Sequence, residues 1–272
     1  IVISKKNNAI SQIMKLDLQN SPVNSSQEIL RKVPGLFIGQ HAGGGKAEQI
    51  FLRGFDVDHG TDVALSVDGM PINMVSHAHG QGYSDLHFII PETVNKIDFG
   101  KGPYKANQGN FATAGYVGFQ TKDKLDASSI TLEAGQFNTT RMVGLFNLLE
   151  SNKKQNAYIA TEYILTDGPF DSPQNFNRFN IFGKYNVQLD NSSKLTLQAS
   201  RFTSSWDASG QIPNRLVENG TISRFGAVDD TEGGFTSRTN FIVSHQKSID
   251  ENTFVKTNVF YSKYDFTLFS NF

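Results

Sequence analysis

The second half of the sequence consists of runs in which apolar and polar residues alternate. In the run from Phe179 to Asp190, every odd-numbered position is apolar, aromatic or glycine, and every even-numbered position is polar except Phe182. A period of two places these two sets on opposite faces of a β-strand. Comparable runs are Ser129–Gly135, Arg141–Leu149, Ala157–Leu165, Leu195–Phe202, Arg238–Lys247 and Phe254–Tyr264. The pattern predicts about seven antiparallel strands of about ten residues, the length that a tilted membrane-spanning strand requires.

The connections between these runs differ in length. Gln136–Asn138 and Asp190–Ser193 predict short turns, whereas Thr166–Asn177 and Ser204–Gly234 are long and rich in Gly, Pro, Asp and Asn. Short turns on one side and long loops on the other are typical of a bacterial outer-membrane barrel. The polar and aromatic residues that we expect in the longer loop are Trp206, Asp207, Arg215, Glu218, Asp229, Asp230 and Glu232.

Two other β architectures fit this pattern less well. A soluble β-sandwich also alternates, but its strands average about five or six residues. A small closed barrel made by this chain alone would have an odd number of strands, which is unusual for bacterial barrels. The last strand-like run, Tyr261–Phe272, continues to the final residue. We therefore predict that residues 123–272 are the first strands of a larger barrel.

The first half, residues 1–122, has a different pattern. Ser25 and Glu28 have the spacing of a capping box and predict a helix over Gln27–Lys32, which Pro34-Gly35 ends. Pro91 predicts the first position of a second short helix. The expected strands are Gln49–Arg53, Asp62–Asp68, Ile97–Gly100 and Tyr116–Thr121. Short helices beside a small mixed sheet predict a compact α+β domain.

Composition excludes several classes of protein. The net charge of the 272 residues is −1, with no dominant basic patch, so nucleic acid is not an expected partner. No cysteine is present, which excludes disulfides and thiolate metal sites. No run approaches the roughly 18 apolar residues of a membrane-spanning helix. Ile1-Val2-Ile3 leads directly into a polar stretch, so we expect a mature chain without a signal peptide.

Five segments of the first half resemble, in order, the motifs of the plug domain of TonB-dependent receptors. They are Glu28–Leu36, Phe51–Phe55, Val67–Pro71, Val94–Pro103, and Gln108-Gly109 with Ala114–Val117. The resemblance implies a plug inside a large barrel of about 22 strands. It also implies a Gram-negative outer-membrane protein that is not an enzyme, with a periplasmic N-terminus. Its expected partners are outer-membrane lipid and the TonB protein.

The resemblance assigns roles to several residues. Gly54, Asp68, Gly69, Gly102, Pro103 and Gly109 would form turns or permit close backbone approach. Arg53 and Lys101 would latch the plug to carboxylates on the barrel wall; the alternative is that both are ordinary exposed charges at strand ends. Ile1, Val2 and Ile3 resemble the end of a TonB box, which binds TonB by strand addition. The alternative is a leading plug segment that lacks the box.

A histidine-rich segment follows the Asp68-Gly69 turn. Within it, His77, His79, Asp85 and His87 are candidate metal or ligand contacts, and Tyr83 lies among them. His41 and His59, each beside glycine in other plug loops, extend the candidate set. With no thiolate available, His77, His79 and His87 would suit Zn²⁺, Cu²⁺, Ni²⁺ or a chelate. The alternatives are contact with an organic ligand and a structural role in hydrogen bonding.

These features predict active import of a scarce, bulky solute by a TonB-dependent transporter. The Lys101-Gly102-Pro103 form of the motif favours a metal ion, a metal chelate such as a siderophore, or a cobalamin-like cofactor over a glycan. No resident cofactor is expected. A glycan or peptide importer and a non-transporting surface receptor remain the alternatives. A metallohydrolase is disfavoured because no His-Glu-x-x-His motif is present.

Overall fold

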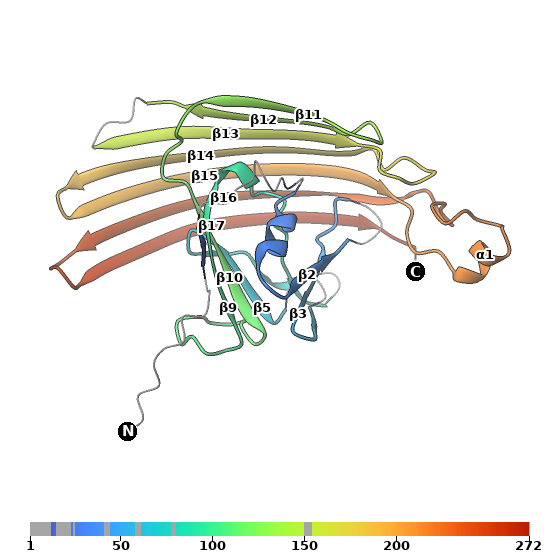
Figure 1. The fold of residues 1–272 in the computed structure, drawn as a ribbon, viewed down its shortest axis with the longest axis horizontal. Coiled ribbons are helices and arrows are strands. Elements are labelled where there is room, and N and C mark those ends of the chain that lie inside the picture. The colour runs from blue at the N-terminus through green and yellow to red at the C-terminus, as the bar shows by residue number, and fades with distance from the viewer. Residues whose placement is uncertain are drawn as a thin grey trace, which may run out of the picture.

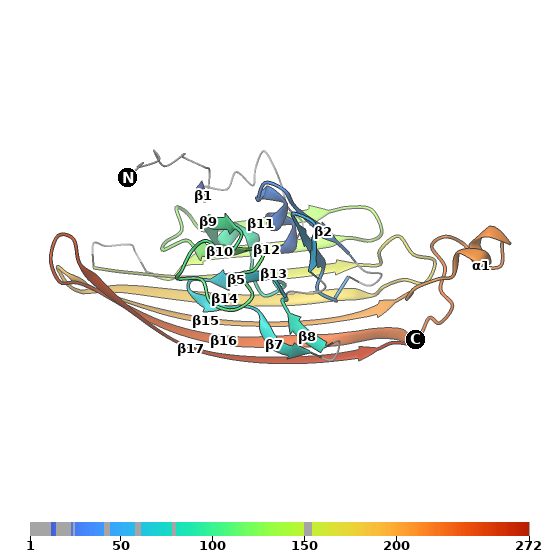
Figure 2. The same ribbon diagram turned by 90° about the horizontal axis from the view of Figure 1, so that it is seen from below.

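The computed structural model describes residues 12–14, 23, 25–40, 44–57, 61–77, 80–149 and 154–271. Of these, residues 12–14, 56–57, 77 and 80–81 are described by their backbone alone. Seven long strands form a curved sheet, which we call the wall, and the smaller N-terminal domain, the plug, lies against one face of it (Figures 1 and 2). No helix among the described residues is long and apolar enough to cross a membrane.

The wall confirms the predicted strand number and antiparallel order. Its seven strands follow one another in sequence, each paired with the next. They are β11 Ser129–Ala134, β12 Thr140–Asn147, β13 Gln155–Thr166, β14 Phe176–Asp190, β15 Ser193–Ala208, β16 Glu232–Ser248 and β17 Phe254–Phe269. The predicted length of about ten residues is wrong for β14 to β17, which have 15 to 17 residues.

The ends of the wall correct two other predictions. Antiparallel order places the turn at 135–139 at the same end as 167–175 and 209–231, and Asp167 N–H donates to Phe137 O at 2.9 Å. We call this the long-loop end; it carries α1, Asn214–Glu218. Trp206 and Asp207 lie in β15, and Glu232 is the first residue of β16, so these three are not in the loop. The last strand ends at Phe269 and does not continue through Asn271.

The two faces of the wall differ in polarity as the alternation predicts, and the polar face is the buried one. In β14, Arg178 and Asn180 are 1% exposed, whereas Phe179 between them is 43% exposed. The polar side chains lie beneath the plug, and the apolar ones point outward, as in barrels whose outer surface contacts lipid. Phe182, the exception to the alternation, is buried because it packs on Tyr158 and belongs to a cluster with Ile90 of the plug.

The plug is a mixed sheet with short flanking elements. The sheet has the order β1-β9-β10-β5-β6, in which β10 is parallel to β5 and antiparallel to β9. Two smaller sheets, β2-β3-β4 and β7-β8, complete the plug. The bounds are β1 Gln12–Met14, β2 Leu36–Gly39, β3 Gln49–Leu52, β4 Phe55–Val57, β5 Val63–Val67, β6 Met70–Pro71, β7 Met74–His77, β8 Gly80–Tyr83, β9 Val94–Lys101 and β10 Gly115–Thr121. The α+β prediction is confirmed.

Both predicted helices are present as single 3₁₀ segments. The first, η1, spans Gln27–Lys32 as predicted, and Glu28 N–H donates to Ser25 Oγ at 3.4 Å, one half of the capping box. The second, η2, spans only Pro91–Thr93. Ile29 and Leu30 of η1 belong to one apolar cluster with the sheet and with Phe202 and Ile242 of the wall. Plug and wall therefore share a core.

The plug–wall interface as the candidate functional site

Several predicted site residues lie outside the described part of the chain. These are Ile1, Val2, Ile3, His41, His59 and His79, and the side chain of His77 is likewise outside it. The described residues contain no group of three histidines or carboxylates that could hold a metal ion. Metal binding by His77 and His79 therefore stays a prediction.

The remaining three residues of the histidine-rich segment are buried against the wall. Ala47 N–H donates to the hydroxyl of Tyr83 at 2.8 Å, and the Tyr83 ring lies 5.9 Å from that of Tyr264 in β17. Asp85 accepts a hydrogen bond from Tyr264 at 3.0 Å, and its other oxygen lies 2.9 Å from Nδ1 of His87. These contacts tie the segment to β17.

Asp85 is held in its ionised form by the same neighbours. Burial alone would raise the pKa of its carboxyl, but His87 beside it and the hydrogen bonds from His87 and Tyr264 lower the pKa below its ordinary value. The backbone oxygen of His87 accepts a hydrogen bond from Asn180 of β14 at 2.8 Å. The polar contacts of Tyr83, Asp85 and His87 described above are therefore made to other residues of the plug and the wall.

The predicted Asp68-Gly69 turn is present and touches the wall. Both residues have positive φ, 49° and 90°, the backbone of a tight hairpin turn between β5 and β6. Asp68 accepts hydrogen bonds from the N–H and hydroxyl of Thr121 at 3.0 and 2.6 Å. A Cβ on Gly69 would lie 2.5 Å from the side-chain nitrogen of Asn258 in β17, so a larger residue would displace that side chain, and the positive φ of Gly69 itself favours glycine.

The other motif residues were predicted either to form turns or to latch the plug to the wall. Gly54 and Gly102 have positive φ, 83° and 77°, as a turn role requires, whereas Gly109 has open space around it and no such backbone strain. Pro103 and Arg53 are exposed, and Lys101 is half-buried. Among the described residues, neither Arg53 nor Lys101 pairs with a carboxylate.

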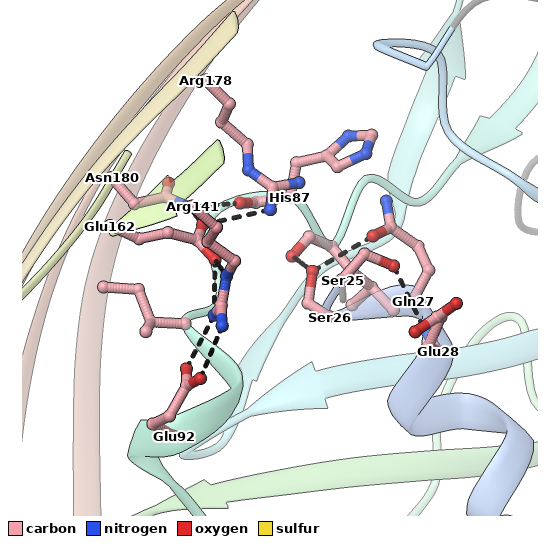
Figure 3. Close-up of polar contacts among 12 residues, drawn as sticks. Ser25, Ser26, Gln27, Glu28, His87, Glu92, Arg141, Glu162, Arg178 and Asn180 are labelled. Atoms are coloured by element: carbon pink, nitrogen blue, oxygen red, sulfur yellow. Dashed lines mark hydrogen bonds and ion pairs between the residues drawn. The ribbon is translucent and has the colours of Figure 1, made fainter. Parts of the chain in front are cut away.

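The ion pairs that do join plug and wall have the opposite polarity, with cations on the wall. Arg141 of β12 donates from both terminal nitrogens to Glu92 of η2, at 2.7 and 2.9 Å (Figure 3). The same guanidinium bonds Glu133 at 3.0 Å and Glu162 at 2.8 Å. A bidentate pair of this kind is among the strongest charge-assisted contacts. It attaches the plug to the first strands of the wall.

Arg178 of β14 lies next to this group with donors to spare. Its Nη2 is 3.1 Å from Glu162, a close charge contact, yet neither Nε nor Nη2 has a directed hydrogen bond to any described residue. Arg178 and Arg141 both line a cavity of about 500 Å³ at the long-loop end, together with His87 and Glu48. Burial raises the pKa of the Glu48 carboxyl to about 7.

A second set of contacts lies toward the opposite, short-turn end. Lys184 of β14 donates to the backbone and side-chain oxygens of Thr121, at 3.2 and 3.0 Å. Its Nζ also lies 3.2 Å from Asp123, in the segment between β10 and β11, and 4.0 Å from Asp68. These groups border a polar cavity of about 450 Å³ between the plug sheet and β14 to β17.

Two further wall residues hold the plug from its middle to its long-loop end. Arg238 of β16 donates to the backbone oxygen of Ile72 at 3.2 Å and lies 4.7 Å from the ring of Phe88. Trp206 of β15 lies directly under the plug loop, because a Cβ on Gly45 would be 1.9 Å from its ring. The sequence analysis did not identify the wall cations Arg141, Lys184 and Arg238 as partners of the plug. Their positions on the polar face of the alternating runs could have indicated this role.

Comparison with known proteins agrees with this architecture. Residues 3–116 match the family described as TonB-dependent Receptor Plug Domain. This part of the chain is the plug of a TonB-dependent receptor. The chain is 32% identical over 138 residues to the vitamin B12 transporter BtuB of Vibrio vulnificus (strain CMCP6), a match that covers 47% of this chain and 22% of BtuB.

Solved structures resemble the chain over nearly all of its residues. The ferric citrate transporter FecA in its unliganded form matches with a TM-score of 0.78 and 13% identity, covering 94% of this chain and 40% of FecA. The copper transporter OprC matches with a TM-score of 0.72 and 16% identity, covering 94% and 38%. At these identities the likeness shows the fold, a plug against antiparallel barrel strands. The chain spans less than half the length of these relatives.

Proposed function

We propose that the whole protein imports a scarce, bulky solute across the outer membrane, with energy delivered by TonB. The observation that carries the proposal is the plug seated on the polar face of the wall, with the apolar face directed outward. A plug in that position closes the barrel lumen. Passage of cargo then requires an event that moves the plug.

The proposed orientation follows from the two ends of the wall. The long-loop end would face the outside and receive cargo, because bacterial barrels carry their longer loops there. The plug leads from the N-terminal segment, which would reach the periplasm. Ile1, Val2 and Ile3 would pair there with TonB through main-chain hydrogen bonds. Cargo binding shifts the plug toward release only if it favours that state.

The cargo class is proposed from chemistry and from relatives. The named relatives carry vitamin B12, ferric citrate and copper, which supports a metal ion, metal chelate or cobalamin-like solute over a glycan or peptide. The predicted latch of Arg53 and Lys101 would use carboxylates of wall strands other than those described. We propose no chemical step for the protein.

The test is uptake by cells. The full-length protein would be expressed in a Gram-negative host that lacks its own importers, with labelled cobalamin, ferric citrate and copper supplied in turn. Uptake of one solute that disappears in a host without TonB is the expected result. A second strain would express the protein without residues 1–3 and should show the same loss. Uptake that persists without TonB, or surface binding without uptake, would contradict the proposal.

A further inference from the structure

We infer that the cargo carries a carboxylate group, and that this group releases the plug by taking the place of Glu92 on Arg141. The inference rests on the proposed import function and adds to it a substrate class and a means of release. It concerns the Arg141–Arg178 pair and the cavity of about 500 Å³ that both residues line.

The first step is the form of the Arg141–Glu92 contact. A guanidinium that binds a carboxylate through two parallel hydrogen bonds, here 2.7 and 2.9 Å, binds any other carboxylate of suitable reach in the same way. Glu92 belongs to the plug and Arg141 to the wall. Replacement of the Glu92 carboxylate by one from solution would therefore break a plug–wall tie without leaving Arg141 unpaired.

The second step is access. Arg141 is almost fully buried, but its side chain lines the cavity at the long-loop end, where Gln136 and Phe137 of the β11–β12 turn also contribute. Arg178 lines the same cavity; its Nη2 is 3.1 Å from Glu162 without a directed hydrogen bond, and its Nε has no hydrogen-bond acceptor among the described residues. A buried guanidinium with unused donors is costly unless a partner supplies acceptors. A cargo carboxylate supplies them.

The third step is charge. Three carboxylates, those of Glu92, Glu133 and Glu162, already surround the two guanidinium groups, so the addition of an anion would increase an existing excess of negative charge. Exchange avoids this, because one carboxylate enters as another leaves. Glu48 also borders the cavity, and its high pKa keeps it largely protonated in mildly acidic solution. A neutral Glu48 does not repel the incoming anion.

The test uses the full-length protein in detergent, with propane-1,2,3-tricarboxylate as the probe and its neutral triamide as the matched control probe. Calorimetry at pH 6 should detect binding of the tricarboxylate and none of the triamide. Arg178→Gln should weaken tricarboxylate binding by about tenfold or more, the loss expected for hydrogen bonds to a charged group. Glu92→Gln, which removes the competing charge, should strengthen it.

Hydrogen exchange supplies the second readout. The tricarboxylate should accelerate amide exchange in 90–95 of the wild-type protein, and should add little in Glu92→Gln, where this segment already exchanges faster. Lys184→Gln is the matched control, because Lys184 ties the plug to the wall but does not line this cavity. It should leave tricarboxylate affinity unchanged.

Two results would overturn the inference. One is equal binding of the tricarboxylate to wild type and Arg178→Gln, with Arg178→Lys as a check that keeps the charge if the glutamine variant misfolds. The other is tricarboxylate binding that leaves exchange in 90–95 unaltered. TonB-dependent uptake of a neutral cargo, with no tricarboxylate binding, would leave the proposed import function intact and remove only this inference.

Discussion

Glu48 combines deep burial with a titration near neutral pH. Its pKa in the folded plug is about 7, against 4.5 for an ordinary glutamate. Between these two values the folded state holds a proton that the unfolded chain has released. The free energy of unfolding therefore decreases as pH rises from about 4.5 to about 7 and stays low above that.

Glu48→Gln should remove this pH dependence. The variant should match the wild type near pH 4.5 and exceed it at pH 8 by up to about 3 kcal/mol, the value of the full pKa difference. Hydrogen exchange of β2 and β3, compared between the two proteins at each pH, measures the difference. If Glu48→Gln were more stable than the wild type by the same amount at pH 4.5 and at pH 8, burial of the Glu48 charge would not be the cause of the added stability.

The histidines separate into two groups that can be tested against each other. His87 contacts Asp85 inside the protein, whereas the backbone of His77 pairs with Gly80 at the end of β7, and His79 lies outside the described residues. If His77 and His79 bind Zn²⁺, Cu²⁺ or Ni²⁺, His77→Ala/His79→Ala should abolish binding in calorimetry. His87→Ala should preserve metal affinity while reducing protection of the plug from hydrogen exchange. Loss of metal binding in His87→Ala alone would contradict this division.

The contacts of the candidate residues show which parts of the site could be predicted from the sequence and which could not. The Asp85–His87 contact spans two positions and was foreseeable as a local pair. Tyr264, the partner of Asp85, is 179 positions away, and Arg141 is 49 positions from Glu92. Such pairs depend on strand register and on how the plug docks. Neither is encoded in a local pattern, so the wall cations were missed while the segment itself was found.

At the scale of the strand, Phe182 is the one apolar residue among the polar positions of the alternating run in β14. Phe182 faces the plug, while Phe179 on the other face of β14 is directed outward. Phe182→Ala should destabilise plug docking by about 3 kcal/mol or more, because it leaves a cavity beside Tyr158 and Ile90. Phe179→Ala, the matched control, should have little effect on docking. Hydrogen exchange of η2 would report both, and equal effects would contradict the assignment.

The alternation located every wall strand but underestimated most lengths. In β15 the predicted run stopped at Phe202, although the strand continues through Ser204, Ser205 and Trp206 to Ala208. Serine and aspartate suggest a loop when they are assessed by turn propensity. In this strand Ser204 fits the buried side against the plug, whereas Asp207 is exposed on the other side. Tertiary context therefore overrode local preference at the ends of the strands.

At the scale of the whole molecule, Lys184 closes the short-turn end. It binds Thr121 and Asp123 where the plug continues into the wall, beside the polar cavity of about 450 Å³. Lys184→Gln should loosen this junction and admit small polar solutes. Liposome swelling with the full-length protein should accelerate. Lys256→Gln is the control, since Lys256 lines the same cavity without an ion pair among the described residues, and an equal leak there would contradict the role of Lys184.

Trp206 is the only tryptophan in these 272 residues, and it is 3% exposed beneath the backbone of Gly45. Its surroundings depend on the plug, because the loop that covers it is part of the domain that moves in the import that we propose. An indole in such a dry setting emits at short wavelength, and its emission shifts to the red when water reaches it. The emission wavelength of Trp206 should therefore report, without any added label, whether the plug covers this part of the wall.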